Sequence, residues 1–183
     1  MRPFDFNIYQ LSAHSFRPVY QLVFPFANTL PGDFLTDTTI NGKRVNYLEN
    51  NRAFYYILGN VAQIGSHLFF RPDAYGNRQG GYIYNLKSGR LTGIDKITPD
   101  ASTSFLFLTD NNIGGSEFSN YGFMAQDGDT LYTSYSSLTL FQQKEANADK
   151  HPVYPPVLTK YLENSKNKRG NPVIIKVRFA DNF

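Results

Sequence analysis

The segment GGYIYNLKSGRLTGI, from Gly80 to Ile94, contains the clearest local signal for the fold. Two runs rich in aromatic and β-branched residues flank a turn at Ser88-Gly89. Glycine readily adopts the positive φ angle that a tight hairpin turn requires. The segment therefore predicts two antiparallel strands joined by a short turn.

Short runs of the same kind extend along most of the chain. Pleated strands prefer the residues that dominate these runs, which are Tyr, Phe, Ile, Val and Thr. A second hairpin turn is predicted at Asp127-Gly128-Asp129. About ten strands without regular β–α alternation predict an all-β fold, namely a sandwich, a barrel or a propeller, and not a doubly wound parallel sheet. Besides the opening segment and the last strand, the runs are FNIYQLS, RPVYQLVFPF, FYYILGN, SHLFFRP, TSFLFLTD, YGFMAQ and DTLYTSYS.

A short helical insert, at about residues 136–168, is predicted before the last strand. Either Ser136 or Ser137 can cap its first helix. The second helix is predicted in PVLTKYLENSKNK and ends before Gly170, and NPVIIKVRF forms the final strand. We treat residues 1–183 as one domain or half-domain. Two apolar pairs in the second helix have i,i+4 spacing: Val157 with Tyr161, and Leu158 with Leu162.

Composition and charge exclude several classes of functional site. The chain has 183 residues, a formal net charge of +3 and no cysteine. The lack of cysteine excludes disulfides, thiol catalysis and zinc–thiolate sites. The densest basic stretch contains Lys166, Lys168 and Arg169. It predicts a solvated turn and not a nucleic-acid surface, which needs a wider basic patch with interleaved aromatics. The sequence predicts neither a membrane span nor a signal peptide.

Metal binding is not predicted, and no cofactor is expected. His14, His67 and His151 lie far apart in the sequence, and His67 is expected to pack or to make a hydrogen bond inside a strand. The segment DTTINGKRVNYLE begins like a calcium loop at Asp37. Its twelfth position is Leu48 and not the bidentate glutamate that such a loop needs, so a polar turn is the preferred interpretation.

The candidate binding residues lie in the segment DNNIGGSEFSNYG. Polar side chains beside aromatic rings suit a carbohydrate or peptide ligand, and propellers bind ligands through loops at one end of their channel. The alternative, which we favour, is that Asn and Gly here only supply turn geometry. No catalytic residue is assigned, because Ser116 lacks the second glycine of a nucleophile elbow. The candidate residues are Asp110, Asn111, Asn112, Glu117, Phe118, Asn120 and Tyr121.

Several segments, in order, resemble the six-bladed β-propeller proteins of Bacteroides and relatives. The first contains Ile8-Tyr9, a strand from Pro18 to Phe24, and a Leu-Pro segment that ends at Leu35. The others are SHLFFRPDAYGNRQGGYIYNLKSGRL, DNNIGGSEFSNYG and the final NPVIIKVRF. A blade has four strands, so this chain resembles about three blades, the C-terminal half of such a ring.

The resemblance implies a periplasmic or cell-surface protein with a non-catalytic binding or interaction role. Two alternatives stay open: a glycan-processing lyase or hydrolase on a propeller scaffold, and a structural half-domain that completes a partner chain. A half-ring exposes blade faces that need covering. We therefore expect either a homodimer or a second propeller half as partner.

Overall fold

The structure is a computed structural model that describes residues 3–78, 81–106 and 125–178. The chain divides into two compact units. Unit 1 consists of residues 1–62 and 69–80, and unit 2 consists of residues 63–68 and 81–183. Each unit is described by itself below.

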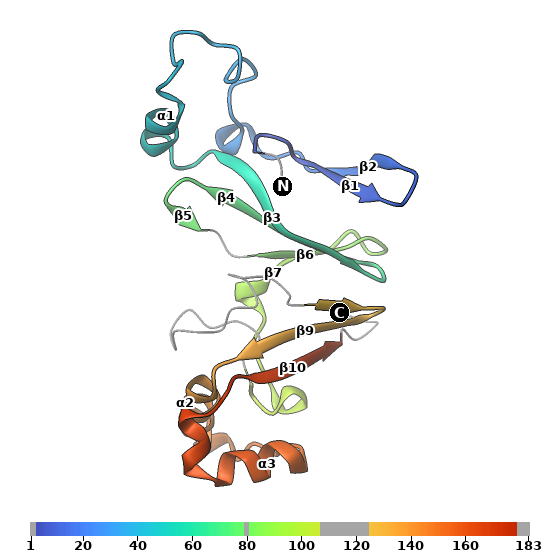
Figure 1. The fold of residues 1–183 in the computed structure, drawn as a ribbon, viewed down its shortest axis with the longest axis vertical. Helices are drawn as coiled ribbons and strands as arrows, with labels where there is room; N and C mark the ends of the chain where they lie inside the picture. Colours follow the sequence, from blue (N-terminus) through green and yellow to red (C-terminus); the bar gives the residue numbers. More distant parts are fainter. Residues whose placement is uncertain (1–2, 79–80, 107–124, 179–183) are drawn as a thin grey trace. The chain divides into compact units, whose positions relative to one another are not determined.

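Strands and short helices make up the described chain, as Figure 1 shows. The strands are β1 (Asn7–Leu11), β2 (Phe16–Gln21), β3 (Tyr55–Ile64), β4 (His67–Ala74), β5 (Asn77–Arg78), β6 (Tyr82–Asn85), β7 (Leu91–Gly93), β8 (Ala125–Asp127), β9 (Thr130–Tyr135) and β10 (Val173–Arg178). The α-helices are α1 (Arg44–Asn50), α2 (Ser137–Ala146) and α3 (Pro156–Glu163). The 3-10 helices are η1 (Phe26–Asn28), η2 (Ile94–Lys96), η3 (Ala101–Thr103), η4 (Ala148–Lys150) and η5 (Ser165–Arg169).

The strands form three sheets within the described ranges. One sheet is the β1-β2 hairpin, and another has the order β10-β9-β8. The largest has the order β3-β4-β6-β7, with β5 paired to β4. All the pairings whose register is resolved are antiparallel. The fold is therefore rich in β-structure, as the sequence predicts.

Unit 1 is held together largely by aromatic side chains. Phe4 contacts both Phe34 and Tyr56, with ring centroids 5.2 and 6.4 Å apart. A second group joins Phe24 to Phe6 and Tyr55. Such tilted and edge-on pairs stabilise a core beyond the area that they bury. The N-terminal residues are thereby fixed against β3.

Unit 2 contains the helical insert and the sheet on which it packs. Tyr135, Leu140, Phe141 and Leu162 form its buried cluster. The Ser136 hydroxyl accepts a hydrogen bond from the backbone N–H of Thr139 and caps α2. In Figure 1, β9 and β10 lie side by side, and α2 and α3 lie between them in the sequence.

The structure confirms both predicted hairpin turns. Strands β6 and β7 flank Gly89, which has a φ of 72°, and β8 and β9 flank Gly128, which has a φ of 56°. The Asn85 side-chain oxygen accepts hydrogen bonds from the backbone N–H groups of Lys87 and Ser88. This side chain stabilises the first turn as an Asx turn does.

Two local predictions were wrong, and one helix was missed. The strand predicted in TSFLFLTD does not form over its described part, because Asp100 caps η3 and the next two residues, Ser104 and Phe105, have positive φ angles. Helix α1 was not predicted at all. Val157 was predicted to share an apolar face with Tyr161, but its side chain is exposed and lies outside the core.

None of the helices in the described ranges has the length and apolar character needed to cross a bilayer.

Candidate functional site

The residues predicted from the sequence to bind a ligand lie outside the described residues, so their prediction is not tested. They are Asp110, Asn111, Asn112, Glu117, Phe118, Asn120 and Tyr121. The candidate sites that follow come from other parts of the chain.

The first candidate site is a cavity of about 470 Å³ in unit 1, which we call the hairpin cavity. Its volume falls within the range that small-molecule sites occupy, roughly 300–1,000 Å³. The cavity is enclosed by residues of the β1-β2 hairpin, by Asp5, which lies two residues before β1, and by two apolar residues of β3. The lining residues are Asp5, Asn7, Ile8, Tyr9, Phe16, Leu58 and Val61.

The strand period places the functional side chains of the hairpin on one face. Asn7 and Tyr9 are two residues apart in β1, and side chains at that spacing point to the same side. Phe16 pairs with Leu11, the next residue in the same alternation. The hairpin turn is closed by a backbone hydrogen bond of 2.9 Å from Ser12 to Ser15.

A fixed carboxylate forms the polar end of the hairpin cavity. Asp5 Oδ1 accepts hydrogen bonds from the backbone N–H of Asn7 at 3.0 Å and from its Nδ2 at 2.8 Å. Asp5 Oδ2 accepts a hydrogen bond of 2.8 Å from the Tyr9 hydroxyl group. Hydrogen bonds to an ionised acceptor are stronger than neutral ones. The three donors therefore hold both the carboxylate and the Tyr9 ring in place.

An aromatic pair forms the apolar end. The rings of Tyr9 and Phe16 are stacked, with centroids 4.5 Å apart and an interplanar angle of 9°. Phe16 is 55% exposed, whereas Leu58 on the opposite wall is 5% exposed. An open aromatic ring beside a fixed carboxylate and an amide can bind a ligand that has both an apolar face and hydroxyl groups.

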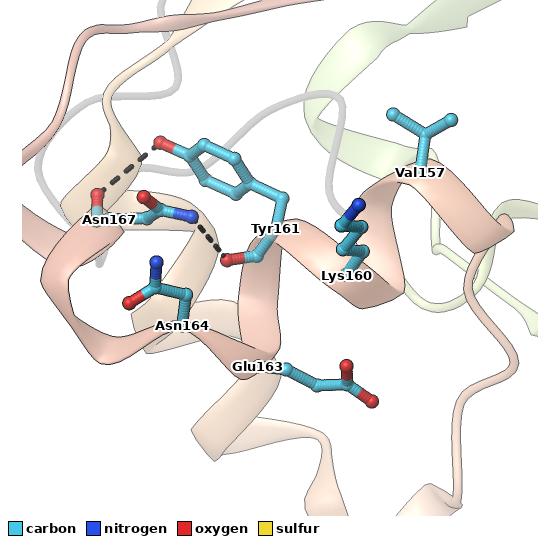
Figure 2. Close-up of a pocket in the computed structure, with 6 residues that line it drawn as sticks. All are labelled: Val157, Lys160, Tyr161, Glu163, Asn164 and Asn167. Atoms are coloured by element: carbon cyan, nitrogen blue, oxygen red, sulfur yellow. Dashed lines mark hydrogen bonds between the residues drawn. The ribbon is translucent and has the colours of Figure 1, made fainter.

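The second candidate site, the α3 cleft, is an open cavity of about 530 Å³ in unit 2. Figure 2 shows its six lining residues, which come from α3, η5 and the residue between them. A hydrogen bond of 2.8 Å joins the Asn167 side-chain amide to the Tyr161 carbonyl. The lining residues are Val157, Lys160, Tyr161, Glu163, Asn164 and Asn167.

The loop that resembles a calcium site is closed by an arginine. The Arg44 guanidinium donates hydrogen bonds to the carbonyl oxygens of Phe34, Leu35 and Asp37, and to the Asn41 side-chain oxygen. The Thr39 hydroxyl and N–H donate to the Asp37 carboxylate and lower its pKa from the ordinary value of 3.8, with a smaller contribution from Arg44. The Arg44 side chain thus joins the start of this loop to the residues just before it.

The remaining predicted features have structural roles or none assigned. His67 is buried in β4, and its Nε2 is 3.3 Å from Asn85 Nδ2, which confirms the expected packing and hydrogen bond. Lys168, in the basic stretch, pairs with Glu145 at 3.1 Å. No group of three or more His, Cys, Asp or Glu suited to a metal ion occurs within the ranges described.

Comparison with known proteins shows a likeness of fold. The chain is similar to the crystal structure of a "putative exported protein" from Bacteroides fragilis NCTC 9343, with a TM-score of 0.55 and 20% sequence identity. The match covers 99% of this chain and 46% of that protein, so the chain spans less than half of the length of its structural neighbour. No family model and no curated protein matches the chain.

Sequence reasoning missed the hairpin cavity, although a signal for it exists. Asp5, Asn7 and Tyr9 stand at alternate positions, which places three hydrogen-bonding side chains on one strand face. The predicted strand FNIYQLS begins at Phe6 and so leaves Asp5 outside the pattern.

Proposed function

We propose that the chain is a non-catalytic binding module of the cell envelope that takes a neutral carbohydrate in the hairpin cavity. The observation that carries this proposal is the stacked pair Tyr9 and Phe16 beside the fixed Asp5 carboxylate. Sugar rings have apolar C–H faces and hydroxyl edges. The cavity offers an aromatic surface for the faces, and carboxylate and amide groups for the edges.

A peptide is the less favoured ligand. Extended peptides bind mainly through main-chain hydrogen bonds to a strand edge, with side-chain pockets adding specificity. The hairpin cavity instead places the polar side chains of Asp5, Asn7 and Tyr9 together. Its polar groups therefore suit the hydroxyl groups of a sugar better than the backbone of a peptide.

The proposed scaffold is a partial β-propeller of about three blades. This is supported by the β-rich fold and by the sequence segments that resemble propeller blades. The name of the structural neighbour from Bacteroides fragilis describes export, which supports a periplasmic or cell-surface location for this chain.

The binding proposal is tested with a panel of neutral oligosaccharides, using the wild-type chain and two variants. Phe16→Ala removes the open ring, and Leu11→Ala removes an exposed apolar side chain from the same hairpin that does not line the cavity. We expect a glycan that binds to the wild type to lose about 1 kcal/mol, roughly fivefold in affinity, with Phe16→Ala. Leu11→Ala should bind as the wild type does.

Two results would overturn the carbohydrate proposal. One is the absence of binding to every neutral glycan at millimolar concentration. The other is an equal loss of glycan affinity in Phe16→Ala and Leu11→Ala, which would show that the bound glycan does not contact the Phe16 ring. Glycan processing in this cavity would need a second carboxylate beside Asp5, and the described lining residues supply Asp5 alone.

A second candidate function is that of a structural half-domain that completes a partner. The match to 46% of a longer protein favours it, because that protein has a further half beside the matched part. Unit 1 also exposes large apolar side chains, including Val23 at 85% and Phe26 at 95%. Exposed apolar patches mark interaction surfaces. The partner is expected to be a second copy or a second propeller half.

A further inference from the structure

The α3 cleft has a frame that is fixed without any ligand. The Tyr161 hydroxyl lies 2.6 Å from the buried Ser137 hydroxyl and donates to the Asn167 carbonyl at 3.3 Å. Figure 2 shows this bond and the reciprocal one, from the Asn167 amide to the Tyr161 carbonyl. A binding site that is already ordered loses less entropy when a ligand binds.

A glycine allows this frame to close. A Cβ atom at Gly170 would lie 3.0 Å from the Asn167 carbonyl oxygen and 3.3 Å from the Tyr161 hydroxyl. Lys144 also donates a hydrogen bond of 3.0 Å to the Leu162 carbonyl and so fastens the end of α3 to α2. The position of the Tyr161 ring is therefore set from both sides of the cleft.

The cleft lining contains one cationic side chain, Lys160, and one anionic side chain, Glu163. Lys144, Lys150 and Lys168 each bond to a protein oxygen, whereas Lys160 has no such bond to any residue in the described ranges. Glu163 also lines the cleft, but Figure 2 shows its carboxylate extending away from the Tyr161 ring and from Asn164. The Lys160 ammonium is therefore available to an anionic group.

The side-chain amides of Asn164 and Asn167 have opposite hydrogen-bonding capacity, and Figure 2 shows them on the other side of Tyr161 from the Lys160 ammonium. The Asn164 side-chain oxygen accepts the Lys166 backbone N–H at 3.1 Å, which leaves its NH₂ group as a donor. The Asn167 NH₂ group donates to the Tyr161 carbonyl, which leaves its side-chain oxygen as an acceptor. The cleft thus offers a cation for a carboxylate, and a donor and an acceptor for hydroxyl groups.

We propose that the α3 cleft binds a sugar that carries a carboxylate, of the uronic acid type. The carboxylate contacts Lys160, and ring hydroxyls bond to the Asn164 NH₂ group and to the Asn167 side-chain oxygen. The sugar face lies against Tyr161 and Val157, an exposed valine that the core does not use. This site is separate from the hairpin cavity and differs from it in the charge that it selects.

The test compares D-glucuronate with D-glucose, which differ only at C6. Binding is followed by NMR on the side-chain NH₂ resonances of Asn164 and Asn167, so that a sugar in the hairpin cavity does not contribute. We expect D-glucuronate to shift these resonances with at least about tenfold higher affinity than D-glucose, because its carboxylate makes charge-assisted hydrogen bonds.

Two charge-matched variants separate a specific site from general attraction. Lys160→Gln should weaken D-glucuronate binding about tenfold, and Lys166→Gln, outside the cleft lining, should change it less than about twofold. Phe16→Ala should leave these shifts unchanged, which keeps this test independent of the hairpin cavity. Equal affinity for the two sugars, or equal loss with both lysine variants, would overturn the proposal.

Discussion

Arg44 ties together the segment between Phe34 and Asn41. Its planar guanidinium donates in several directions at once, so one side chain satisfies three carbonyl oxygens and an amide oxygen. A lysine ammonium is a compact group and cannot span the same acceptors. The geometry of the arginine fork, and not charge alone, is therefore what orders the loop.

Arg44→Lys should accordingly destabilise the chain while keeping its charge. We expect a loss of about 1–2 kcal/mol in the free energy of unfolding, measured by urea denaturation, because at least two carbonyl hydrogen bonds are lost. The control is Arg90→Lys in the exposed turn after β6, for which a change below about 0.5 kcal/mol is expected. Equal effects of the two substitutions would contradict this role of Arg44.

At the scale of one element, β4 contains an ion pair on a largely buried face. Arg71 and Asp73 are two residues apart, with Nε and Oδ1 3.0 Å apart, and their side chains are 11% and 17% exposed. On β3, a Cβ at Gly59 would lie 3.4 Å from Asp73 Oδ2 and 3.6 Å from an Arg71 nitrogen. Gly59 on β3 therefore lies directly against the pair, at ordinary contact distance.

Asp73→Asn removes the negative charge that faces Arg71 in this low-dielectric position. We expect a loss of about 3 kcal/mol in the free energy of unfolding. Asp95→Asn, in the exposed pair with Lys96, should cost less than about 1 kcal/mol. The double variant Arg71→Met, Asp73→Leu should recover most of the loss. An Asp73→Asn variant as stable as Asp95→Asn would show that solvent already screens the pair.

The elements differ in how far the sequence could predict them. The hairpins at Gly89 and Gly128 follow from local chemistry, because one residue fixes each turn. The strand predicted at residues 103–110 does not form over residues 103–106. The Asp100 side chain accepts a hydrogen bond from the N–H of Ser102, and this local turn competes with an extended backbone. Helix α1 was missed because it buries only Leu48 and so lacks an apolar stripe.

The hairpin cavity depends on contacts that no local pattern contains. Tyr9 and Phe16 meet only because the β1-β2 register places them on one face, and Leu58 reaches them from β3. The strand alternation of Asp5, Asn7 and Tyr9 predicts a polar face, but it does not predict the apolar wall. A cavity between elements requires their packing to be known.

At the scale of the whole molecule, exposed apolar residues of unit 1 point to association. Val23 and Phe26 lie just after β2, and every residue of β2 except Tyr20 is exposed. A two-stranded hairpin is only marginally stable in water without a partner to cover it. A second copy of the chain would supply about the length that the longer structural neighbour has in addition.

Light scattering coupled to size-exclusion chromatography measures the molar mass of the chain in solution and so tests this association directly. We expect a mass of twice 20.8 kDa for the wild type, and a shift toward 20.8 kDa for Val23→Ser combined with Phe26→Ser. Val45→Ser, on the exposed side of α1, should keep the wild-type mass. A wild-type monomer at high micromolar concentration would rule out the homodimer and leave the second propeller half as the expected partner.

The pairing of Tyr135 with Val173 brings the two ends of the segment between them together. These two residues face each other directly in the β9-β10 ladder, so their Cα atoms are only about 5 Å apart. Residues 136–172 thus leave the sheet and rejoin it at one place, a distance that a two-residue turn can bridge. A two-residue turn in place of the segment would therefore keep the β9-β10 ladder in register, but it would uncover Tyr135, which packs against Leu140, Phe141 and Leu162.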